Sequence, residues 1–219
     1  MRRAVSRYVL IAFITLPLFA ADPPPLTLVF GESSVTVSGV APKATIYLYS
    51  LAREPKGYVS NVVAHDTRLS DDDGDGRAVW AFEKPLAQRS FWLAVELDSG
   101  RYVAGTPEAY TNAERIDLTA SHLKKDSAGE VQQLSAEGGM IEFVAVRPKD
   151  GSIWSATVTS LGTSDEGKEH GKVTLSAARL LPRGNSADGP PKSLRKDDVV
   201  LIVNSFTAQY GVARVGDWR

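Results

Sequence analysis

Three aspartates at alternate positions form a local motif with a defined chemistry. The segment Asp71-Asp-Asp-Gly-Asp-Gly76 places carboxylates at Asp71, Asp73 and Asp75 and ends on a glycine. Hard oxygen ligands two residues apart can wrap one Ca²⁺ ion, and the glycine permits the sharp bend that such a loop needs. The spacing therefore predicts a Ca²⁺ site at Asp71, Asp73 and Asp75.

The second half of an EF-hand loop is missing from this segment. The twelfth position is Phe82, where a bidentate glutamate is needed, and Glu83 follows one residue late. A calcium loop of another kind recruits its last ligands elsewhere in the chain, and Asp66 is a candidate for that role. The alternative interpretation is an acidic, solvent-exposed turn in which Asp and Gly serve the backbone geometry.

Other motifs with a known chemistry are absent from the sequence. His65, His122 and His170 lack the spacing of a zinc site. No Gly-x-Ser-x-Gly elbow or glycine-rich phosphate loop occurs, and the Ser-x-x-Lys match at Ser193 follows a proline pair in a polar loop. Paired carboxylates for glycoside cleavage can come from separate strands, so a secreted hydrolase or accessory subunit remains an alternative.

Short β-strands are the elements that must position the acidic segment. Apolar or alternating runs bounded by turn residues cover 26–29, 35–38, 45–51, 58–64, 77–82, 90–97 and 101–104. Many short strands separated by turns in so short a region are typical of a β-sandwich. Trp80, Trp92 and, later in the chain, Trp154 lie in strand patterns and are expected in the core. Phe91 precedes Trp92, so one of the two must face a binding surface or the second half of the chain.

Three segments of this first region carry a family resemblance. Residues 35–47 read as an opening strand, a turn and a second strand. Residues 73–80 read as an Asp/Gly turn before a strand with an inward tryptophan, and 90–100 as a closing hairpin. In these segments the region of about 26–106 resembles bacterial immunoglobulin-like domains, the modules of surface and adhesion proteins. The resemblance implies a binding or spacer module rather than an enzyme.

The middle and last parts of the chain differ in pattern. Capping-box spacings at Thr111–Glu114 and Ser127–Glu130 predict one or two helical turns within a linker or surface excursion, 108–137. Strand patterns return at 140–146, 153–159, 172–176, 198–203 and 209–215. The continuous apolar run 198–203 predicts a strand buried on both faces.

The first twenty residues have the features of a secretory leader. Three arginines precede a short apolar run that ends in small residues, so residues 1–20 are expected to be a signal peptide cleaved after Ala20. The run is too short for a membrane span, although an uncleaved anchor is the alternative. The chain has no cysteine, which favours a bacterial envelope or secreted protein over a disulfide-stabilised one.

Charge and pattern together define the expected protein. Removing the leader takes away three of the 25 basic residues and none of the 26 acidic ones, so the mature chain is mildly acidic. The sequence has no basic stripe of the kind that nucleic-acid binding normally needs. We expect an all-β, secreted or periplasmic protein with an Ig-like β-sandwich at 25–107, a linker at 108–137 and a second β-rich region at 138–219. Its expected role is a non-catalytic envelope or extracellular module that binds a protein or glycan surface. A Ca²⁺-stabilised adhesion unit is a related alternative. No membrane span is expected after leader cleavage.

Overall fold

The computed structural model describes residues 23–56, 59–119, 122–125, 131–136, 139–159, 173–184 and 189–217. Strands make up nearly all of its regular structure, so the predicted all-β class is confirmed. The first half contains β1 Thr27–Phe30, β2 Ser34–Ser38, β3 Thr45–Lys56, β4 Val59–Ser70, β5 Arg77–Ala81, β6 Ser90–Glu96 and β7 Tyr102–Gly105. The second half contains β8 Glu114–Arg115, β9 Leu123–Lys125, β10 Val131–Ala136, β11 Met140–Arg147, β12 Ser152–Thr159, β13 Val173–Ser176, the 3₁₀ turn η1 Ala177–Arg179, β14 Leu181–Pro182, β15 Val199–Asn204 and β16 Gln209–Arg214.

These strands form four sheets. Sheet 1 has the order β1-β2-β5, and sheet 2 has the order β4-β3-β6-β7. Sheet 3 has the order β14-β12-β11-β15-β16-β8, and sheet 4 has the order β13-β10-β9. The described strand pairs are antiparallel except for the short pair of β16 with β8, which is parallel. The chain completes sheets 1 and 2 before it enters sheets 3 and 4.

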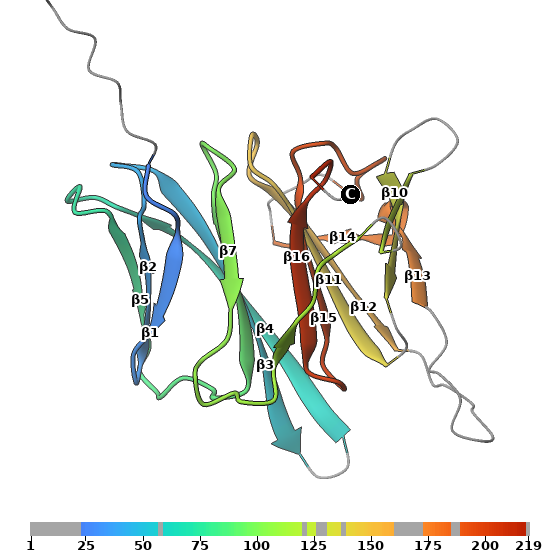
Figure 1. Cartoon of the computed structure of the whole chain (residues 1–219), viewed down its shortest axis with the longest axis horizontal. Coiled ribbons are helices and arrows are strands. Elements are labelled where there is room, and N and C mark those ends of the chain that lie inside the picture. The colour runs from blue at the N-terminus through green and yellow to red at the C-terminus, as the bar shows by residue number, and fades with distance from the viewer. Residues whose placement is uncertain are drawn as a thin grey trace, which may run out of the picture.

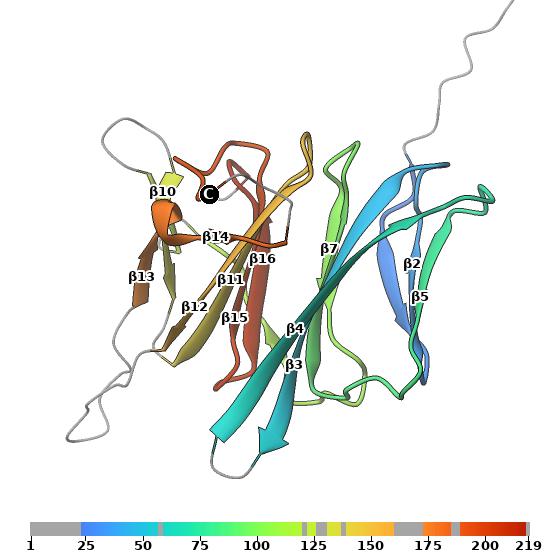
Figure 2. The ribbon, with the colours of Figure 1, turned by 180° about the vertical axis from the view of Figure 1, so that it is seen from behind.

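The four sheets stack face to face in numerical order along the long axis of the molecule (Figures 1 and 2). One hydrophobic cluster lies between sheets 1 and 2 and includes Val35, Ile46 and Trp92. A second fills the space between sheets 2 and 3, and a third fills the space between sheets 3 and 4. The protein thus consists of two β-sandwiches, and the cluster between sheets 2 and 3 is the apolar layer where they meet.

Sheets 2 and 3 are covered on both faces, which explains their continuous apolar strands. All seven residues of β6 are buried. Trp92 faces sheet 1, whereas the neighbouring Phe91 faces sheet 3 and lies 5.5 Å, centroid to centroid, from Tyr210. Phe91 is therefore the member of the pair that contacts the second half of the chain, which is one of the two expected roles. All six residues of β15 are also buried, so the predicted doubly buried strand is confirmed.

The middle of the chain differs from its prediction. Its described part, expected as a linker with helical turns, forms β8, β9 and β10. Leu118, Leu123 and Leu134 are buried in the cluster between sheets 3 and 4. Pairing of β10 with β9 and β13, together with burial of Leu134, outweighs the local helix signal, since tertiary contacts routinely override weak propensities. The second capping box, Ser127–Glu130, lies outside the described residues.

Several expectations fall outside the part of the chain that the structure describes. The predicted leader, residues 1–20, is among them, as is His170. Within the described ranges, no helix has the length and apolar character needed to cross a membrane.

Candidate metal centre

The loop between β4 and β5 brings the three predicted aspartates together. It carries the chain from sheet 2 to sheet 1. One carboxylate oxygen from each of Asp71, Asp73 and Asp75 lies within 4.8 Å of the other two. Within the described ranges this is the one group of three or more potential metal-ligating side chains. The arrangement therefore gathers three negative charges at one point of the first sandwich.

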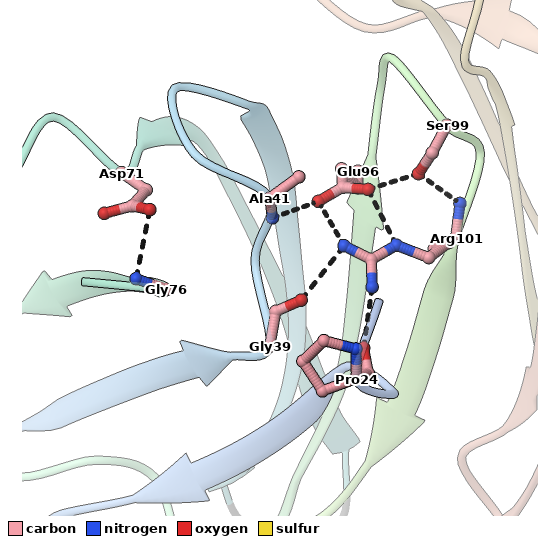
Figure 3. Close-up of polar contacts among 8 residues, drawn as sticks. All are labelled: Pro24, Gly39, Ala41, Asp71, Gly76, Glu96, Ser99 and Arg101. Atoms are coloured by element: carbon pink, nitrogen blue, oxygen red, sulfur yellow. Dashed lines mark hydrogen bonds and ion pairs between the residues drawn. The ribbon is translucent and has the colours of Figure 1, made fainter. Parts of the chain in front are cut away.

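Asp71 is fully buried, with 0% of its surface exposed. Its Oδ2 accepts a hydrogen bond from the Gly76 backbone N–H at 3.1 Å (Figure 3), and Gly76 has a φ of 82° that favours glycine. Its Oδ1 is also buried and has no hydrogen-bond partner among the described residues. An exposed acidic turn therefore does not describe Asp71. Burial without a partner is unfavourable for a carboxylate oxygen.

The other carboxylates of the loop are exposed to solvent. Asp73 Oδ1 accepts a 3.3 Å hydrogen bond from the Asp75 backbone N–H. Asp72, which points elsewhere, accepts a 2.6 Å hydrogen bond from the Ser70 hydroxyl. The loop thus presents one buried and two exposed carboxylates on the same side and separates Asp72 from them.

Asp66 does not join this group. Its Oδ2 accepts hydrogen bonds from Arg183 Nε at 2.7 Å and from the Tyr47 hydroxyl at 3.2 Å. Arg183 follows β14 of sheet 3, so the pair connects the two sandwiches. The structure therefore assigns Asp66 a role in the contact between the sandwiches rather than in the acidic loop.

A buried glutamate near this contact was not identified from the sequence. Glu142 on β11 is 5% exposed, and its Oε2 accepts a 2.7 Å hydrogen bond from the Thr157 hydroxyl. Burial raises the pKa of Glu142 to about 7, although Thr157 and the charge of Arg183 act in the opposite direction. The nearby Tyr49 hydroxyl is buried and has no partner among the described residues. The sequence feature that could have identified Glu142 is the presence of a single glutamate inside the apolar run 140–146.

Glu96 is a third buried carboxylate, and it is fully paired. Arg101 donates to it through Nε at 2.8 Å and Nη2 at 2.6 Å, and the Ala41 backbone N–H donates at 2.8 Å (Figure 3). Ser99 also donates a hydrogen bond to it. Burial alone raises the pKa of Glu96, but these hydrogen bonds outweigh burial and hold it below its usual value.

The remaining sequence candidates are dispersed. His65 on β4 is exposed, and His122 directly precedes β9 of sheet 4. These two described histidines do not belong to a common metal-binding group. The Ser193 carbonyl accepts a 3.3 Å hydrogen bond from Arg147. Trp92 and Trp154 are each 3% exposed, as expected for core residues. Trp80 is partly buried against the core of the first sandwich.

A cavity of about 480 Å³ opens beside the aromatic cluster of the first sandwich. Trp92 and Phe82 line it, together with His65, Glu83 and Lys84. Among the described residues that line it, Glu83 alone carries a carboxylate, whereas glycoside cleavage requires a pair.

No protein-family model matches the chain, and no curated protein matches it in sequence.

Proposed function

We propose that the mature chain is an exported, non-catalytic β module that acts by surface binding, with its first sandwich built on the immunoglobulin-like plan. The observation that carries this proposal is the strand order, with β1-β2-β5 facing β4-β3-β6-β7. Seven antiparallel strands divided between two packed sheets are the plan of that architecture. The chain changes sheet between β2 and β3, between β4 and β5, and between β5 and β6.

The outer face of sheet 1 supports a role in surface contact. Sheets 2 and 3 are covered on both sides, whereas no described element covers the outer face of sheet 1 (Figure 1). Val29 and Val79 are 55% and 54% exposed on this face. Both lie beside Thr36 in the strand register, so an uncharged row crosses all three strands. Such a flat, uncharged row suits contact with another surface better than it suits catalysis in a cleft.

A binding assay with matched variants tests the proposal. The probe is the insoluble envelope fraction of the producing cells, and the readout is co-sedimentation of the purified mature chain. Val79→Lys places a charge in the uncharged row, and the retained fraction is expected to fall several-fold. Thr174→Lys, at an exposed position of β13 in sheet 4, is the matched control and should bind as the unmodified chain does.

Two outcomes contradict the proposal. Equal retention of both variants and the unmodified chain excludes binding through sheet 1. Hydrolysis of the envelope material that is abolished by Glu142→Gln shows an enzyme instead of a non-catalytic module. Export has its own test, because N-terminal sequencing of the extracellular or periplasmic protein should find Ala21 as the first residue.

A further inference from the structure

Asp71 Oδ1 is the observation that the surface-binding proposal does not use. It is a buried carboxylate oxygen without a hydrogen-bond partner among the described residues. The other oxygen of the same group is satisfied by the Gly76 N–H at 3.1 Å. An ionised carboxylate in this position is destabilising unless a positive charge compensates it. No ion pair links Asp71 to a described lysine or arginine.

Two more carboxylates lie beside the Asp71 carboxylate. Asp73 and Asp75 each place an oxygen within 4.8 Å of Asp71 and of one another. Three negative groups at this separation repel one another unless a cation lies among them. Two oxygens bound on opposite sides of one Ca²⁺ ion are about 5 Å apart, because each Ca–O bond is about 2.3–2.6 Å long. The group therefore has the dimensions of a Ca²⁺ site.

We propose that Asp71, Asp73 and Asp75 bind one Ca²⁺ ion, with Asp71 Oδ1 as the buried ligand. Only oxygen ligands are present, which selects a hard cation over zinc or copper. The exposed side of the loop leaves further positions to water, and no atom lies within 4 Å of the point where a side chain at Gly74 would begin. This inference does not depend on surface binding by sheet 1.

The ion would stabilise one end of the first sandwich. The Lys43 N–H donates to the Asp71 carbonyl at 3.2 Å, and the Val40 N–H donates to the Gly76 carbonyl at 3.1 Å. The acidic loop is thereby joined to the connection between β2 and β3, which also passes from one sheet of the sandwich to the other. An ion that holds the acidic loop in place therefore stabilises both connections between the two sheets, β4–β5 and β2–β3.

The same end of the sandwich holds the first described residues of the chain. Ala41 in the β2–β3 connection donates to Glu96, whose partner Arg101 donates to the carbonyls of Gly39 at 2.9 Å and Pro24 at 2.7 Å (Figure 3). The β2–β3 connection therefore links two sets of hydrogen bonds, one to the acidic loop and one that reaches Pro24 through Glu96 and Arg101. Calcium is expected to protect this end of the molecule and to leave sheets 3 and 4 unchanged.

Thermal unfolding of the full mature chain tests the site. The metal-free protein is titrated with CaCl₂ and, separately, with MgCl₂. At a Ca²⁺ concentration about one hundred times the dissociation constant, the melting temperature should rise by roughly 5 to 10 °C. Asp73→Asn and Asp75→Asn should lose this rise and melt as the unmodified chain does in chelator, because both side chains are exposed. Asp72→Asn removes an equal charge from the same loop and should keep the rise.

Hydrogen exchange locates the effect. Calcium should slow exchange of the Val40, Lys43 and Gly76 amides and leave the Leu180 amide, which bonds within the second sandwich, unchanged. Three results overturn the proposal: no change in melting temperature at millimolar Ca²⁺, an equal response to Mg²⁺, or a rise that Asp73→Asn retains. A response that Asp72→Asn also loses shows a general charge effect and overturns it as well.

Discussion

Asp71 and Glu142 are both carboxylates buried in β structure, and the protein accommodates them differently. Glu142 lies between the sandwiches, where a single hydroxyl donates to it and burial raises its pKa to about 7, so its neutral form is far more populated near pH 7 than that of an exposed glutamate. Asp71 lies in the acidic loop beside two other carboxylates. A proton removes the single charge of Glu142, whereas we infer that the three adjacent carboxylates of the acidic loop bind a divalent cation.

Glu96 completes the comparison because it is buried and ionised. Arg101 and two further donors hold its pKa below the usual value. The difference among the three sites is the number of donors that reach each carboxylate. Glu96 accepts hydrogen bonds from Arg101, Ser99 and Ala41. Glu142 accepts one from a hydroxyl, and Asp71 accepts one from a backbone amide.

Among these three sites, the largest expected effect comes from removing the carboxylate of Glu96. Glu96→Ala leaves the Arg101 guanidinium, whose side chain is 19% exposed, without its partner. Breaking a buried ion pair on one side costs about 3–5 kcal/mol of unfolding free energy. Urea denaturation measures the loss. Asp98→Ala, at an exposed position of the same turn, is the control, and an equal loss in both variants contradicts the role of Glu96.

The next effect is a dependence of stability on pH. Since the folded state raises the pKa of Glu142 to about 7, the protonated form stabilises the fold, and this contribution is complete below the unfolded pKa of about 4.5. It is lost as pH rises through about 7, with a total on the order of 3 kcal/mol. Denaturation from about pH 5 to pH 8 should show the decline, and Glu142→Gln should remove it. The exposed control Glu83→Gln should keep the decline in stability. A decline that also persists in Glu142→Gln contradicts this account.

The effect of Asp71→Asn on stability should change sign when Ca²⁺ is added. Asparagine keeps an oxygen for the Gly76 N–H but places no buried charge in the loop. In chelator the variant should be more stable than the unmodified chain, by on the order of 2 kcal/mol. In saturating Ca²⁺ the order should reverse, because the unmodified chain alone retains the complete ligand set. Lower stability of Asp71→Asn in both conditions would show that the carboxylate is compensated without a metal.

The smallest effects distinguish two neighbouring tyrosines. Tyr47→Phe removes the hydroxyl that donates to Asp66 at 3.2 Å, and a loss of about 1 kcal/mol is expected. Tyr49→Phe removes a buried hydroxyl without a partner among the described residues, so stability should stay within about 0.5 kcal/mol or rise. Chemical denaturation of both variants measures the difference, and a greater loss in Tyr49→Phe than in Tyr47→Phe reverses the assignment.

Much of the fold could be predicted from local patterns. Runs of β-branched and aromatic residues located the strands of both halves, and the apolar run 198–203 correctly indicated a strand covered on both faces. The β4 strand extends to Ser70, beyond its expected end at residue 64, because its polar second half pairs with β3. Strand β10 was not predicted, because its local signals favour a helix and one of its two partners, β13, is distant in sequence.

The candidate site could be predicted only in part. The spacing of Asp71, Asp73 and Asp75 was sufficient to indicate that the three carboxylates converge. Burial of Asp71 could not be read from the sequence, because it depends on where the loop joins two sheets and on contacts from Lys43. The environment of Glu142 depends in the same way on the packing of one sandwich against the other.

A crystal structure of the protein grown with CaCl₂, with anomalous data collected at long wavelength, tests the central claim most directly. The account predicts one anomalous peak at about 2.3–2.6 Å from Asp71 Oδ1 and from an oxygen of Asp73 and of Asp75. A loop without a peak, in which Asp71 Oδ1 is hydrogen-bonded to water or to a basic side chain, would show that the acidic loop does not bind calcium.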